Sequence, residues 1–178
     1  MKKRFFKMAF LTFTLFLSSG NIIAQERNIR DLDFLIGEWN VREDNKEKKW
    51  WEKSTRIGRY VLDSTYIELK ASAISSSGKK RTYNWYIHYN SKKNQFEMVS
   101  MFSNWYEVLF DILIWDSTQR KLTIKHNSDS DSNDYHERYG EIIFDESFNE
   151  YIWVGENKYG DPNSPSVWKY VEKGLRTK

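Results

Sequence analysis

The chain has 178 residues and no cysteine, which excludes disulfides, thiolate metal sites and cysteine nucleophiles. Its formal charge of +3 depends on the first 24 residues, which carry four basic and no acidic side chains. The other 154 residues carry a net charge of −1. A nearly neutral chain without a basic, aromatic-interleaved stretch argues against a nucleic-acid partner. A chain of this length buries roughly 70% of its unfolded surface, which predicts one compact domain.

The first residues have the three parts of a secretory signal peptide: a basic start, an apolar run over Met8–Leu17 and a small-residue exit at Ala24. A transmembrane helix needs roughly 20 apolar residues, and here Ser18–Asn21 interrupt the run after about ten. We therefore expect residues 1–24 to be cleaved. Residues 25–178 would form a single exported domain, periplasmic or secreted, with no membrane span after cleavage.

A short helical turn is predicted between Asn28 and Ile36, where apolar residues recur three apart behind a possible N-cap. Alternation of apolar and polar residues then takes over and predicts about ten strands. Turn residues separate them, so consecutive strands form antiparallel hairpins in a closed barrel or a sandwich, and the fold class is all-β. The predicted strands are Glu38–Glu43, Lys48–Thr55, Tyr60–Lys70, Arg81–Tyr89, Gln95–Ser103, Tyr106–Trp115, Leu122–His126, His136–Asp145, Tyr151–Gly155 and Val167–Glu172.

Two predicted strands indicate which faces point inward. Along Arg81–Tyr89, the residues Tyr83, Trp85 and Ile87 share one face, which is the better candidate for the interior. The strand Tyr106–Trp115 is apolar on both faces, so it either packs beneath another element or forms a contact surface. Its two faces are Val108, Phe110, Ile112 and Ile114 on one side, and Glu107, Leu109, Asp111, Leu113 and Trp115 on the other.

Several short motifs carry a family resemblance. They are Leu35-Ile36-Gly37-Glu38-Trp39, Ile87-His88-Tyr89-Asn90, Leu122-Thr123-Ile124, Tyr135-His136-Glu137-Arg138, and Trp168 with Tyr170. In this order the chain resembles the bacterial lipocalin-like domains of unknown function in the calycin group. The resemblance implies a closed barrel with Gly37 and Trp39 as its structural motif. It further implies that Trp39 packs across the closed end beneath a late arginine, with Arg138 and Arg176 as possible partners.

A barrel of this kind favours binding of a small apolar or aromatic molecule, buried against ring faces and oriented by one or two polar groups. The predicted lining consists of Tyr83, Trp85, Ile87, Phe102 and Phe110, with His126 and Arg138 as polar groups. The alternative is that the aromatic residues serve as strand formers and fill the interior. The protein would then be a structural or protein-interaction barrel with an outer apolar patch around Val108, Phe110, Ile112 and Ile114.

Two cofactor hypotheses are less favoured than structural explanations. An inward His126 has the chemistry of an axial haem ligand, but a histidine at the edge of a core is far commoner. Asp129, Asp131 and Asn133 alternate as in a calcium loop, yet Asp134 stands where glycine is needed and Gly140 where a glutamate is needed. A solvated hairpin loop explains them better, and no cofactor is predicted.

Catalysis is also less favoured than binding. Asp111 and Glu107 lie four residues apart, two steps along an otherwise apolar strand face, and a buried, unpaired carboxyl has the raised pKa of a general acid. Convergence of Asp111 with Arg138 or His126 inside the barrel would favour a calycin-type enzyme. No nucleophile, base or metal ligand set accompanies them, so no catalytic residue is predicted.

Overall fold

The computed structural model describes residues 28–126 and 135–177. The predicted signal peptide lies outside these residues, as do Asp129, Asp131 and Asn133, for which a calcium loop was the less favoured hypothesis. Within them, one 3-10 helix, η1 (Ile29–Leu35), precedes ten strands. The strands are β1 (Gly37–Asn45), β2 (Trp50–Val61), β3 (Tyr66–Ser75), β4 (Lys80–Asn90), β5 (Gln95–Phe102), β6 (Leu109–Asp116), β7 (Lys121–His126), β8 (Tyr135–Phe144), β9 (Glu150–Gly160) and β10 (Ser166–Arg176).

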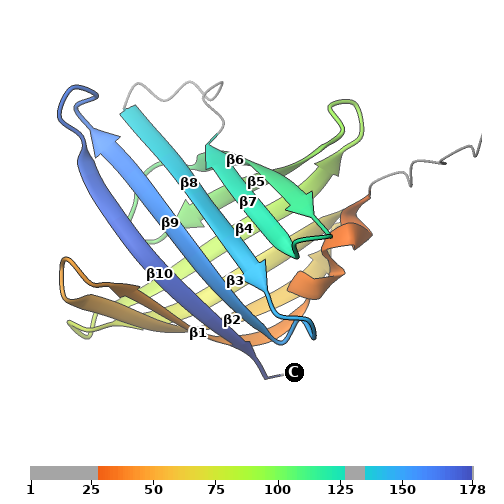
Figure 1. Cartoon of the computed structure of the whole chain (residues 1–178), viewed down its shortest axis with the longest axis horizontal. Coiled ribbons are helices and arrows are strands. Elements are labelled where there is room, and N and C mark those ends of the chain that lie inside the picture. Colours follow the sequence, from red (N-terminus) through yellow and green to blue (C-terminus); the bar gives the residue numbers. More distant parts are fainter. Residues whose placement is uncertain (1–27, 127–134, 178) are drawn as a thin grey trace, which may run out of the picture.

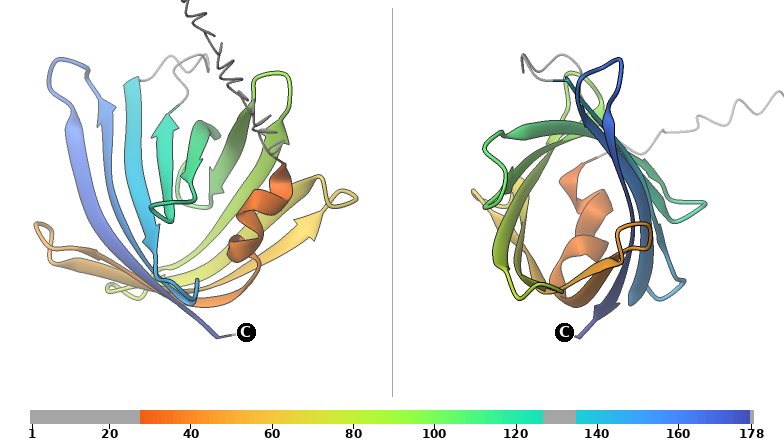
Figure 2. Two further views of the ribbon diagram at one scale, coloured as in Figure 1. Left: turned by 45° about the vertical axis from the view of Figure 1, so that its right-hand side comes forward. Right: turned by 90° about the vertical axis from the view of Figure 1, so that its left-hand side faces the viewer.

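The ten strands form one closed antiparallel barrel in which each strand pairs with its neighbours in the chain (Figure 1). The barrel closes between the two ends of the sequence, because β10 pairs with β1 and places Arg176 opposite Trp39. In the right-hand view of Figure 2, which looks along the barrel, η1 lies across one end. The prediction of an all-β, ten-stranded antiparallel barrel is confirmed.

The helical turn is confirmed with its cap. The side chain of Asn28 accepts a hydrogen bond from the Arg30 amide at 2.8 Å, and the Asp31 carboxylate accepts one from the Asn28 amide at 3.2 Å. This reciprocal pair satisfies two amides that the first turn leaves free. The apolar side of the turn, Leu32 and Leu35, is buried in the core.

Several predicted boundaries are wrong: β6 begins at Leu109 and not at Tyr106, and β9 extends to Gly160 beyond Gly155. The stretch Tyr60–Lys70 was expected to be a single strand, but β2 continues to Val61 and a turn separates it from β3. Three consecutive non-glycine residues of this turn, Leu62, Asp63 and Ser64, have positive φ values of 49°, 54° and 63°. Because the turn uses neither glycine nor proline, the usual sequence signals do not mark it.

The barrel interior is divided into two halves. The half next to η1 is filled by apolar side chains from most of the strands, among them Trp39, Ile67, Ile87, Phe96, Leu113, Leu122, Ile124 and Phe144. Burying each such side chain stabilises the fold by roughly 1.5–3 kcal/mol. The other half contains charged and aromatic residues, so this half holds the candidate site.

Two inward glycines of the last strands make room for rings. A Cβ atom on Gly174 would overlap the ring of Tyr151, and one on Gly155 would overlap the ring of Tyr170. Glycine is therefore required at both positions by close approach of a neighbouring side chain. The recessed wall lets the two tyrosines lie flat against the strands.

Candidate ligand cavity

A cavity of about 300 Å³ occupies the half of the barrel away from η1. Its wall is built by inward positions of several strands and by the loop between β5 and β6. Nine of the lining side chains are aromatic: Trp50, Tyr83, Trp85, Phe102, Trp105, Trp153, Tyr159, Trp168 and Tyr170. Cavities of this size and aromatic character are typical of small-molecule sites.

The structure brings together most of the predicted lining. Tyr83, Trp85, Phe102 and Arg138 all line the cavity. Ile87 points inward as predicted but lies deeper, in the apolar half of the barrel.

His126 and Phe110 lie elsewhere. The side chain of His126 is inside the barrel but outside the cavity wall, next to Asp111. Phe110 was expected in the lining, and this is wrong: its side chain points outward and is 42% exposed. The inward face of β6 carries Leu109, Asp111 and Leu113, so Phe110 falls on the other face of the pleat.

A buried ion pair forms one side of the cavity floor. Arg56 binds Glu172 through two parallel hydrogen bonds, from Nη1 to Oε1 and from Nη2 to Oε2, each 2.9 Å long. The hydroxyl of Tyr151 donates to Glu172 Oε1 at 2.7 Å and accepts from Arg56 Nη1 at 2.8 Å. The Arg56 guanidinium also lies over Trp85, with Cζ 4.7 Å from the ring centroid. Bidentate geometry and ring stacking fix the position of this arginine.

A second buried pair forms the other side. Arg138 Nη1 lies 3.1 Å from Asp111 Oδ2 and 3.3 Å from the hydroxyl of Ser100. His126 Nδ1 is 3.8 Å from the other oxygen of Asp111. Asp111 therefore meets both groups that the sequence analysis paired it with. However, Arg138 and not Asp111 lines the cavity, so this carboxylate orients the arginine and does not face a ligand.

The ring of His136 stacks on His126, with centroids 5.4 Å apart. Burial, together with repulsion from His126 and Arg138, lowers the pKa of His136 to about 4. Its imidazole is therefore neutral near pH 7. A role for His126 as a haem ligand stays a prediction.

Two carboxyl groups stand at the outer end of the cavity. Glu52 accepts a hydrogen bond from the Tyr83 hydroxyl at 2.6 Å and lies 3.3 Å from Arg81. Glu43 accepts a hydrogen bond from the indole N–H of Trp168 at 3.4 Å. Burial, helped by the charge of Glu172, raises the pKa of Glu43 to about 8. Glu43 is thus mainly protonated at neutral pH.

Trp105 extends over the cavity from the loop between β5 and β6. Its ring meets His136 on β8 edge-on at 6.2 Å and Tyr159 on β9 at 5.8 Å. Trp105 was not among the predicted lining residues, because it lies between two predicted strands and alternation therefore gives it no face. The sequence analysis also missed Glu43, Glu52, Arg56 and Glu172.

The segment around Gly37 and Trp39 has the expected geometry. Arg176, one of the two arginines considered, lies over Trp39 with Cζ 4.4 Å from the ring centroid. Its guanidinium donates to the carbonyl oxygens of Phe34 and Ile36, and its Nε donates to that of Phe148 at 3.1 Å. Trp39 is 2% exposed. The tryptophan is therefore structural, as the resemblance implied.

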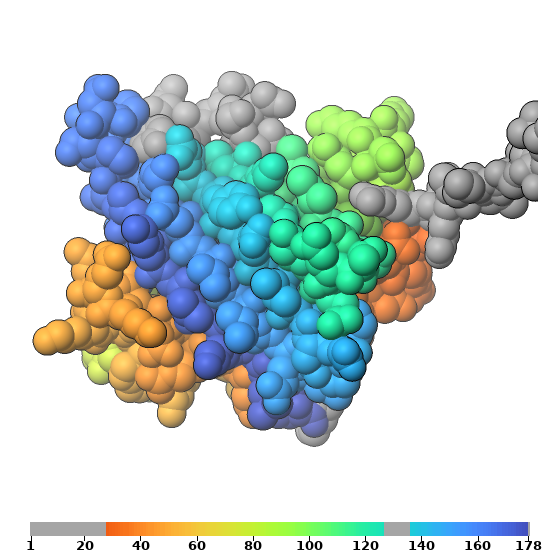
Figure 3. Space-filling view, viewed as in Figure 1, coloured from red at the N-terminus to blue at the C-terminus, as the bar shows by residue number. Residues whose placement is uncertain are grey.

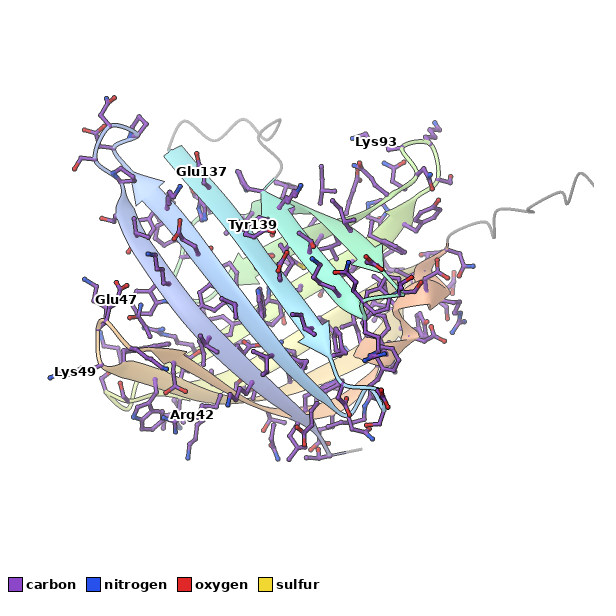
Figure 4. The ribbon with its side chains drawn as sticks, viewed as in Figure 1. Arg42, Glu47, Lys49, Lys93, Glu137 and Tyr139 are labelled. Atoms are coloured by element: carbon purple, nitrogen blue, oxygen red, sulfur yellow. The ribbon has the colours of Figure 1, made fainter. Side chains whose placement is uncertain are left out.

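The outer surface also exposes apolar side chains. Val108, Phe110 and Ile114 of the predicted outer patch are 46%, 42% and 42% exposed. Exposed apolar residues continue over β8, β9 and β10, on the face that Figure 3 shows, and Tyr139 points away from the barrel there (Figure 4). The further exposed apolar residues on these strands are Ile143, Ile152, Val154, Val167 and Leu175.

Among residues 28–126 and 135–177, no group of three or more histidine or acidic side chains is arranged to hold a metal ion. No helix in this part of the chain is long and apolar enough to cross a membrane.

The fold and site together define an antiparallel ten-stranded barrel that encloses a cavity. No protein-family model and no curated protein sequence matches the chain. Solved structures do. The S-type phycobiliprotein lyase CPES from Guillardia theta is 11% identical, with a TM-score of 0.58 over 85% of this chain and 94% of that protein. Rv2717c from M. tuberculosis is 10% identical, with a TM-score of 0.58 over 84% and 96% of the two chains. At these identities the similarity shows the fold alone.

Proposed function

We propose that this protein is an exported lipocalin-like barrel that reversibly binds a small aromatic or apolar molecule. The observation that carries the proposal is the cavity of about 300 Å³ with nine aromatic side chains in its wall. The signal-peptide pattern of residues 1–24 supports export, and the motif around Gly37 and Trp39 supports the lipocalin-like family. The similar fold of a phycobiliprotein lyase is in keeping with a barrel that receives a small molecule.

Binding would depend on a wall that is rigid before the ligand arrives. Trp85 and Trp153 are held beneath the Arg56 guanidinium, with Cζ 4.7 Å and 5.9 Å from their ring centroids. Arg138 lies 5.8 Å from the ring of Phe102. Because both arginines are fixed by buried carboxylates, the rings lose little further freedom when a ligand packs on them. Such preorganisation raises affinity without added contact area.

The test is native mass spectrometry of residues 25–178 purified gently from the host's own extract, followed by titration with the molecule found. Trp85→Ala should lower the affinity for that molecule by at least about ten-fold, because it removes a ring from the wall. Trp51→Ala is the matched control, since Trp51 lies on the outer face of β2 beneath Arg42, and it should leave the affinity unchanged. A bare mass, with Trp85→Ala reducing only stability, would show a packed interior instead.

A protein-interaction barrel is the second candidate. It is favoured by the exposed apolar residues of the outer face, among which Ile143 and Ile152 pair across β8 and β9. Contiguous exposed apolar surface of this kind marks interaction sites in other proteins. A bare mass in the experiment above, together with a complex of larger size in the same extract, would favour this function.

A further inference from the structure

The cavity wall contains buried N–H groups that have no hydrogen-bonding partner among the described residues. They are Nε of Arg56 and the indole N–H groups of Trp85 and Trp105. The indole N–H of Trp153 is also unpaired, but it lies against Gly140 of β8 and thus faces the wall. A donor left unpaired inside a protein costs about 1–3 kcal/mol, so each needs a partner.

Unpaired acceptors in the wall are fewer. Asn157 contributes its side-chain oxygen, and both ring nitrogens of His136 are buried without a partner. Because burial keeps this imidazole neutral, it offers one donor and one acceptor. Counting both, the side chains that line the cavity hold four unpaired donors and two unpaired acceptors.

Charge does not account for this excess of donors. Three arginines line the cavity, and each lies beside a carboxylate: Arg56 beside Glu172, Arg81 beside Glu52 and Arg138 beside Asp111. Glu43 adds no full charge near neutral pH, since its pKa lies at about 8. The wall is therefore close to neutral in charge. Its unpaired polar groups are mainly hydrogen-bond donors.

We propose that the ligand is an aromatic molecule bearing acceptor oxygens, and that these oxygens accept hydrogen bonds from the unpaired N–H groups of Arg56, Trp85 and Trp105. The inference rests on the proposed binding function and narrows its ligand class. A purely hydrocarbon ligand would leave the same donors buried and unpaired, and would bind more weakly for that reason.

The experiment uses two probes of nearly equal size. One is 6-propionyl-2-(dimethylamino)naphthalene, a ketone whose emission shifts to the red when its carbonyl accepts a hydrogen bond. The other is 6-propyl-2-(dimethylamino)naphthalene, in which CH₂ replaces the carbonyl. In fluorescence titrations of residues 25–178, we expect the ketone to bind at least ten-fold more tightly, with red-shifted emission.

A double variant tests the donors themselves. Trp85→Phe with Trp105→Phe keeps a ring at both positions and removes both N–H groups. It should abolish most of the preference for the ketone and shift its emission to the blue, while the affinity for the propyl probe stays within about three-fold. Trp51→Phe is the matched control, because Trp51 lies on the outer face of β2 beneath Arg42 and outside the cavity wall. It should leave the preference intact.

The outcomes separate the two proposals. If neither probe binds the wild-type protein, or if binding is undiminished in Trp85→Ala and so lies outside the cavity, the binding function itself is contradicted. If both probes bind equally well, the cavity binds aromatic molecules but water satisfies its donors, and the inference on ligand class is wrong. A ketone preference that the double variant retains would also overturn it. Thermal unfolding of each variant verifies that the barrel is intact.

Discussion

Arg176 in the last strand covers the indole ring of Trp39 in the first, with its Cζ 4.4 Å from the ring centroid. The same guanidinium donates to the carbonyl oxygens of Phe34 in η1 and of Ile36, which connects η1 to β1. One side chain therefore joins the two ends of the sheet and the helix that lies across the barrel. Cation–π contacts of this kind contribute roughly 0.5–2 kcal/mol.

Arg176→Leu should lower the free energy of unfolding by about 2–3 kcal/mol, because it removes the cation–π contact and leaves backbone carbonyls unpaired. Arg42→Leu is the control: Arg42 points away from the barrel and pairs with the exposed Asp44 (Figure 4). That control should change stability little. Urea denaturation monitored by tryptophan fluorescence measures both. Equal free energies of unfolding for the two variants would contradict a stabilising role of Arg176 at the closure of the barrel.

The buried pair Arg56–Glu172 gives a second prediction. Glu172→Gln should destabilise the fold by about 3–5 kcal/mol, because it leaves the Arg56 guanidinium buried without a counter-charge. Replacing both residues, Arg56→Met with Glu172→Leu, should restore much of the loss, since no buried charge remains. Denaturation of wild type and the two variants checks this. A double variant less stable than Glu172→Gln would show that the pair itself holds the barrel together.

The raised pKa of Glu43 predicts that the free energy of unfolding decreases as the pH rises towards 8. In the folded protein burial, and then the charge of Glu172, raise its pKa to about 8 from an ordinary value of 4.5. Between these pH values the folded state keeps a proton that the unfolded state has released, so stability falls as the pH rises from about 4.5 to 8. Other groups near Glu43 are Glu52, Arg56 and Trp168.

Glu43→Gln imitates the protonated carboxyl and should flatten that pH dependence. The measurement is urea denaturation at several pH values between 4.5 and 9. Glu47→Gln, in the exposed turn after β1, is the matched control and should keep the wild-type profile (Figure 4). A profile for Glu43→Gln that parallels the wild type would show that Glu43 is ionised throughout this range.

Alternation along the chain was sufficient to predict the strands, because nearly every strand buries one face and a period of two is then unavoidable. It also placed Tyr83, Trp85 and Ile87 correctly inside. It failed at Phe110, because β6 is apolar on both faces and hydrophobicity alone does not distinguish them. Asp111 lies on the opposite face, which is the inward one. A carboxylate is buried there because it pairs with Arg138, and alternation of hydrophobicity does not reveal such a pair.

The charged half of the cavity could not be predicted in the same way. In β2 the inward residues are Glu52, Ser54 and Arg56, while the apolar Ile57 is 49% exposed, so the usual relation between polarity and burial is reversed. Arg56 is buried only because it pairs with Glu172 on β10, the strand on the other side of β1. Pairings between residues so far apart in sequence leave no local pattern. The one available signal was that Glu52, Ser54 and Arg56 recur at every second position, which places them on the same face of a strand.

The pairing of β1 with β10 has a consequence for how the protein acquires its cavity. The contact between Arg176 and Ile36 spans 140 positions, so the sheet stays an open ribbon until nearly the whole described chain is present. Until then the edges of β1 and of the newest strand carry unpaired amides and carbonyls that attract other chains. Closure by such distant segments is a slow kind of folding event. Binding competence should therefore arise in one late step, with no partly functional intermediate.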